Sequence, residues 1–165
     1  MKILSIPNES GKMTCFWEEG ASSGKKPLII CLADKEEDAQ RDLNLLFSQA
    51  NGASVAALVI YPQTEEQIVG DWLYSLRQRE DVDENRITLT GTLSAADWVW
   101  RLGSHFPQWF AGICAVGGYG DPYEVRAMKN VPVRAYLVEE EPQIIRKGKV
   151  AVNVDQLVMS LLTAG

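Results

Sequence analysis

The sequence predicts an α/β protein with a doubly wound, mostly parallel sheet and helices on both faces. Short, continuously apolar segments of the kind found in strands buried on both faces alternate with longer amphipathic segments that suit helices. The expected parallel strands are residues 27–33, 55–61, 87–90, 112–116 and 131–138. Turn residues separate two further apolar segments, 3–6 and 13–17, which predicts an N-terminal antiparallel hairpin.

Amphipathic segments between these strands predict the helices. They cover residues 35–50, 65–79, 94–105 and 155–164. Asp34, with Glu37 three residues later, is expected to cap the first helix, and Thr64 the second. Residues 81–85 are expected to form a charged turn. In such sheets a ligand crevice lies beyond the carboxyl ends of the strands, so Asp34 and Thr92 lie where a site is expected.

Composition narrows the class of protein and its partners. The 165 residues fit a single domain, 1–165, with 46% hydrophobic and 23% charged residues. A net charge of -6 argues against a nucleic-acid partner, because phosphate binding requires a basic surface. No apolar run reaches the ~18 residues of a membrane span. The first residues lack the features of a signal peptide, so we expect a cytoplasmic location.

The three cysteines, Cys15, Cys31 and Cys114, lie in apolar segments without metal-ligand spacing. We expect buried free thiols, and neither a metal nor a cofactor. The tryptophans are expected to pack in the core, with one of them as a candidate for lining a pocket. They are Trp72, Trp98, Trp100 and Trp109.

Residues 86–100, RITLTGTLSAADWVW, combine a short strand, a glycine and a helix. This is the geometry of a nucleophile elbow, whose pattern G-x-S-x-G raises one side chain above the sheet. The residue at the attacking position is Leu93, which has no group that can attack a carbonyl. Ser94, one residue out of register, is the alternative nucleophile. It is also a typical helix N-terminal serine that bonds locally.

Residues 82–100, VDENRITLTGTLSAADWVW, resemble D-x-x-R-I-x-L-T-G-x-S-x-G-G-x-x-x-W of the α/β-hydrolase superfamily. The similarity is to its esterase and polyhydroxybutyrate-depolymerase-like branch. It continues without a gap through residues 100–122. Residues 27–34 resemble the strand before the oxyanion loop, and residues 131–141 resemble the strand that delivers the triad acid. The resemblance implies an α/β-hydrolase-like fold with its site at the elbow.

The same resemblance implies that the site has lost its chemistry. It places Leu93 at the nucleophile, Ala33 and Asp34 at the oxyanion loop, and Glu141 at the acid. At the oxyanion loop, the aspartate Asp34 would repel a developing oxyanion. The single histidine, His105, matches a position near the far end of the elbow helix. The expected vestigial site consists of Leu93, Glu141, Ala33, Asp34 and Thr92.

These features predict a catalytically inactive α/β-hydrolase-like domain, a pseudoenzyme, with a binding or assembly role. The alternatives are an active serine esterase that uses Ser94 or is completed by another chain, and a piece of a longer polypeptide. In the family one more strand covers the strand that matches 131–138. We therefore expect residues 133–138 to form an edge that recruits a second copy or a partner protein, unless residues 149–152 cap it.

Overall fold

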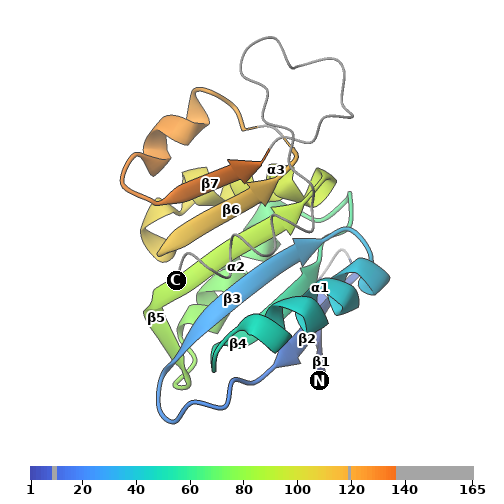
Figure 1. Cartoon of the computed structure of the whole chain (residues 1–165). Coiled ribbons are helices and arrows are strands. Elements are labelled where there is room, and N and C mark those ends of the chain that lie inside the picture. Colours follow the sequence, from blue (N-terminus) through green and yellow to red (C-terminus); the bar gives the residue numbers. More distant parts are fainter. Residues whose placement is uncertain (9–10, 119, 137–165) are drawn as a thin grey trace.

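The computed structural model describes residues 1–8, 11–118 and 120–136, without the side chains of residues 4–12. Within this part of the chain the core is a seven-stranded sheet in the order β1-β2-β4-β3-β5-β6-β7 (Figure 1). The strands are β1 (Lys2–Asn8), β2 (Gly11–Glu18), β3 (Lys26–Ala33), β4 (Ser54–Val59), β5 (Val82–Thr92), β6 (Gly112–Val116) and β7 (Val133–Tyr136). Glu141 and the predicted elements at 149–152 and 155–164 lie outside the described residues.

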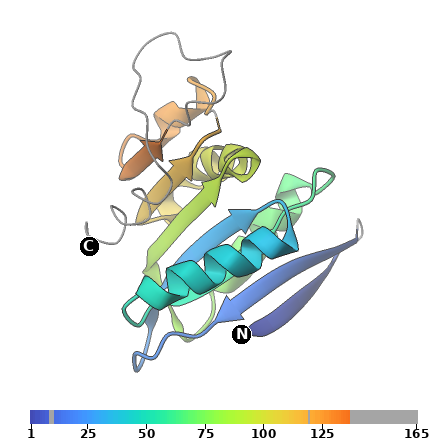
Figure 2. The same cartoon turned by 45° about the vertical axis from the view of Figure 1, so that its right-hand side comes forward.

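The strand directions confirm the predicted fold class. β1 and β2 form the expected antiparallel hairpin, and β2 is also antiparallel to β4. β3 is parallel to both β4 and β5, and β6 is parallel to β5 and β7. Figure 2 shows the hairpin at one margin of the twisted sheet and β7 at the other.

Helices cover both faces of the sheet because successive strand residues point to opposite sides. α1 (Glu36–Gln49) lies on one face, and α2 (Glu66–Arg77) and α3 (Ser94–His105) lie on the other (Figure 1). Buried residues on the α1 side include Cys31, Leu43 and Val55. Those on the α2 and α3 side include Leu89 and Val99. Two short 3-10 helices follow α3, η1 (Pro107–Trp109) and η2 (Glu124–Met128).

Both predicted helix caps are wrong. Lys35, and not Asp34, precedes the first turn of α1, and its side chain makes no capping hydrogen bond. The Asp34 carboxylate instead accepts a hydrogen bond from Ser94, far away in the sequence. Glu65 stands at the start of α2, while Thr64 Oγ1 accepts the Tyr61 backbone N–H at 3.2 Å. The Asp34 carboxylate and the Thr64 hydroxyl therefore have partners outside the helices that they were expected to cap.

The charged turn predicted over residues 81–85 is also wrong, because β5 already begins at Val82. Val82 is buried and pairs with Lys26 of β3. The pairing shifts in register between Lys26 and Leu28. Three exposed polar residues precede the buried part of the strand, which begins at Ile87.

The three cysteines are buried free thiols, as the sequence predicts. Burial raises the pKa of the Cys15 thiol to about 12 and that of Cys114 to about 11. Burial also raises the pKa of Cys31. The thiolate is the reactive form of cysteine, and a raised pKa keeps these thiols protonated. The three side chains therefore contribute to packing and not to chemistry.

None of the helices in the described part of the chain combines the length and apolar character needed to cross a membrane.

Candidate functional site

Leu93 is the single residue between the end of β5 at Thr92 and the start of α3 at Ser94. Its backbone has φ 53° and ψ −124°. Only Leu93 and Asn51 combine a side chain with positive φ among the described residues. A leucine in such a conformation costs about 1–3 kcal/mol. The Leu93 side chain is 57% exposed, so it projects from the tip of a strained strand-to-helix turn.

Backbone contacts hold this turn in place. The Leu93 N–H donates to the Val116 carbonyl at the end of β6, at 2.7 Å. Gly91 allows α3 to approach the strand closely. A Cβ at Gly91 would lie 2.8 Å from Val99 Cγ2 and 3.0 Å from the Ala95 carbonyl oxygen. The close strand-to-helix contact of an elbow is therefore present.

Asp34 and Ser94 meet beside this turn. β3 and β5 are neighbouring parallel strands, so their carboxyl ends lie at the same edge of the sheet. Asp34 follows the buried Ala33, the last residue of β3, and its carboxylate accepts the Ser94 hydroxyl. The structure thus brings Leu93, Ser94 and Asp34 to one edge, next to the terminal strand residues Ala33 and Thr92.

His105 lies at the other end of α3. Its Nδ1 pairs with the carboxylate of Glu66, and its Nε2 is 3.8 Å from a carboxylate oxygen of Glu124. Eleven residues of helix separate it from Ser94, which corresponds to about 16 Å. Since the sequence contains one histidine, no imidazole of this chain reaches the Ser94 hydroxyl to accept its proton.

Metal ligation has no candidate in the part of the chain that the structure describes. No group of three or more histidine, cysteine, aspartate or glutamate side chains is arranged there to hold an ion. The pair of Asp34 and Ser94 offers one carboxylate and one hydroxyl. The arrangement at the elbow is therefore polar on one side and apolar at its tip.

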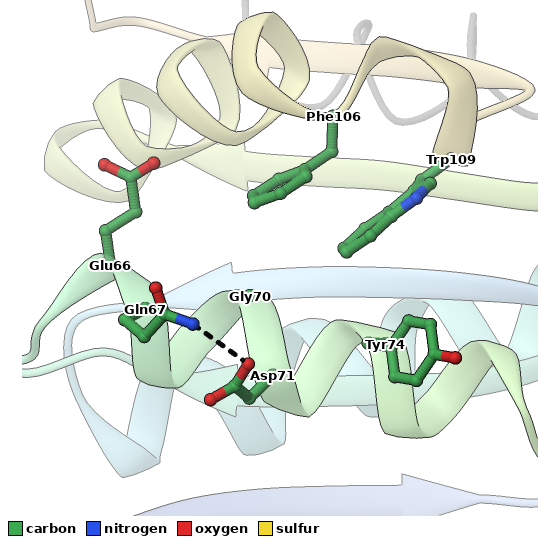
Figure 3. A pocket seen from close by; sticks show the side chains of 7 residues that line it. All are labelled: Glu66, Gln67, Gly70, Asp71, Tyr74, Phe106 and Trp109. Atoms are coloured by element: carbon green, nitrogen blue, oxygen red, sulfur yellow. Dashed lines mark hydrogen bonds between the residues drawn. The ribbon is translucent and has the colours of Figure 1, made fainter.

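Sequence reasoning missed a pocket between α2 and η1 (Figure 3). Trp109, one of the four tryptophans expected mainly to pack in the core, lines this pocket. The local signal that could have found it is Gly70. A glycine in the middle of an amphipathic helix is costly and often has a packing reason.

No protein-family model and no curated protein matches the sequence. Solved structures do match. A thermostable esterase aligns with 98% of this chain and 51% of its own, at TM-score 0.73 and 17% identity. The 2,6-dihydroxy-pseudo-oxynicotine hydrolase aligns with 73% of this chain and 38% of its own length, at TM-score 0.60 and 15% identity. Est1E from Butyrivibrio proteoclasticus aligns with 68% of this chain and 49% of its own length, at TM-score 0.58 and 12% identity.

These similarities establish the fold. The chain has the α/β-hydrolase fold, as the resemblance around the elbow implies. It spans about half or less of the length of these three structures.

Proposed function

We propose that this chain is a catalytically inactive α/β-hydrolase-like domain with a binding or assembly role. The observation that carries the proposal is the backbone conformation of Leu93, the residue at the tip of the elbow turn. In an active elbow this position presents the nucleophile. Here it presents a side chain that can form apolar contacts and no covalent bond to a substrate.

The surroundings of Leu93 support the same proposal. A hydrolase of this fold also needs a base and hydrogen-bond donors for the oxyanion. His105 lies at the far end of α3 and pairs with Glu66. The Asp34 carboxylate, beside the turn, is an acceptor and carries the same sign of charge as an oxyanion. Because a catalytic triad acts as a unit, the loss of each part removes nearly all of the rate.

The turn itself favours a role in binding. Its strain persists only because the surrounding structure fixes it, and strained turns concentrate at sites that contact ligands. An exposed leucine beside a hydroxyl and a carboxylate offers one apolar contact and two polar ones. We propose that Leu93 is the contact that a ligand or partner makes at this edge.

The alternative function is an active serine esterase that uses Ser94 or is completed by another chain. One observation favours it: the exposed Ser94 hydroxyl donates to the Asp34 carboxylate, which offers a direct acceptor for its proton. The thermostable esterase to which this chain is similar adds weight, since the alignment leaves about half of that structure unmatched.

Hydrolysis of short-chain aryl esters separates the two functions. The purified chain, the Ser94→Ala variant and the Ser48→Ala variant are assayed together. Ser48 is an exposed helical serine on α1, so its variant is a control for loss of a surface hydroxyl. We expect all three rates to equal the buffer background. A rate that disappears in Ser94→Ala and survives in Ser48→Ala would establish the esterase instead.

A further inference from the structure

A pocket of about 360 Å³ opens on the helical face between α2 and the residues that follow α3 (Figure 3). One wall is a single stripe of α2, because residues three and four apart share a helix face. Phe106 and Trp109 form the other wall. The lining residues are Glu66, Gln67, Gly70, Asp71, Tyr74, Phe106 and Trp109. Leu93 lies at the opposite end of α3, roughly 18 Å away along the helix.

Three aromatic rings surround this pocket. Phe106 and Trp109 are stacked, with ring centroids 4.2 Å apart and planes 11° apart. The Tyr74 ring lies 6.2 Å from that of Trp109 and is tilted by 45°. Gly70 permits the arrangement, because a Cβ there would lie 3.3 Å from Phe106 Cζ. The end of the Phe106 ring therefore rests on bare helix backbone.

The charges on the lining residues all have one sign. Glu66 and Asp71 contribute two carboxylates, and no lining residue carries a positive charge. Glu66 is paired with His105, whereas Asp71 is exposed and accepts a hydrogen bond from the neutral Gln67 amide at 3.3 Å. Asp71 therefore keeps its charge available to a ligand.

A cation of the protein lies over one of these rings, so a ligand cation must use the ring surfaces that Arg77 leaves open. The Arg77 guanidinium carbon lies 5.4 Å from the centroid of the Trp109 ring. Arg77 is also paired with the Glu84 carboxylate, at 3.4 Å. The electron-rich face of an aromatic ring attracts a cation, and more strongly when the cation is shielded from water.

We infer that this pocket binds a small organic cation with an apolar body, of the quaternary ammonium class. The rings of Tyr74, Phe106 and Trp109 contact its methyl groups, and the Asp71 carboxylate supplies the opposite charge. The Asp71 carboxylate repels an anionic ligand. The volume lies at the small end of the range for ligand pockets, about 300–1,000 Å³.

Nuclear magnetic resonance on isotope-labelled protein tests the inference. The indole N–H signal of Trp109 and the amide signal of Gly70 are followed while choline is added. A parallel titration uses the neutral isostere of choline, in which a tert-butyl group replaces the trimethylammonium group. We expect saturable shifts at both signals with choline, and binding of the isostere about five-fold weaker, because the cation–ring attraction is lost.

Two variants assign the effect to the pocket. Asp71→Asn removes the charge at nearly constant volume, and Tyr74→Leu removes a ring but keeps an apolar side chain. Each is expected to weaken choline binding about three- to five-fold. Glu37→Gln is the matched control, because it removes one exposed carboxylate from the opposite face of the sheet and is expected to leave the affinity unchanged.

Three results would overturn the inference. One is equal affinity for choline and its neutral isostere, which would make the pocket merely apolar. Another is unchanged choline binding in both Asp71→Asn and Tyr74→Leu. The third is the absence of saturable shifts at Trp109 and Gly70. The pocket and the elbow are separate, so none of these results bears on the ester-hydrolysis assay.

Discussion

Replacing Leu93 by glycine and by alanine measures whether the elbow turn is strained. Both variants remove the same atoms beyond Cβ, so the loss of the partly exposed leucine side chain cancels in the comparison. The two variants differ only in the Cβ atom. At φ 53° and ψ −124° that atom is strained in alanine and absent in glycine.

The expected difference follows from two opposing terms. Relief of backbone strain favours glycine by about 1–3 kcal/mol. Glycine also loosens the unfolded chain, which favours alanine by about 0.4–1 kcal/mol. With the middle value of each range, the Leu93→Gly variant should be more stable than Leu93→Ala by about 1.3 kcal/mol. With a urea slope of about 2 kcal/mol/M, the unfolding midpoints should differ by about 0.6 M.

Leu45 provides the matched control. It is also a partly exposed leucine, 41% against the 57% of Leu93, but it lies within α1. In a helix interior alanine is more stable than glycine by about 1 kcal/mol. The order of the two variants should thus reverse between the sites when urea unfolding is followed by circular dichroism. An alanine variant at Leu93 as stable as the glycine variant would refute the strained turn.

Three further predictions follow from the described structure. Leu93→Ser alone should not raise ester hydrolysis above background, because a serine without a base is a weak nucleophile; a measurable rate would reveal a base elsewhere. Cys15, Cys31 and Cys114 should resist a thiol reagent at pH 8 and react after unfolding in urea, since burial shields each thiol and raises its pKa further above that pH; reaction in the native protein would contradict this. The exposed residues of β7, the last strand of the described sheet, lead us to propose pairing with a second copy or a partner protein. Light scattering should then show an assembly, whereas a monomer with slowly exchanging amides at Ala135 and Tyr136 would argue for capping within the chain.

Much of the fold could be predicted because its signals are local. The buried strand β6 and the helix α3 have the bounds that the sequence predicts, residues 112–116 and 94–105. Each combines a clear hydrophobic pattern with an abrupt end, such as Pro107 after α3. The start of β5 could not be predicted, because its charged residues have the composition of a turn. Only the pairing of Val82 with Lys26, which is distant in the sequence, makes this segment a strand.

The candidate site shows the same division. The position of Leu93 at the tip follows from the spacing to Gly91, a local property of the turn. The contact between Asp34 and Ser94 joins residues 60 positions apart, so the local sequence indicates only a helix cap at Asp34. The close contact of Phe106 with Gly70 likewise joins the residue that follows α3 to the middle of α2, 36 positions earlier in the sequence. Such contacts are absent from any local pattern of residues.

The elbow geometry depends on atoms other than the side chain at its tip. The backbone N–H of residue 93 bonds to Val116, and the close approach of α3 depends on the missing Cβ of Gly91 and on the small, buried Ala95. The side chain of residue 93 points outward and takes little part in this packing. The turn therefore does not depend on which side chain stands at its tip. The fold alone does not determine acyl transfer, which depends on the side chains at the turn together with a base and with donors for the oxyanion.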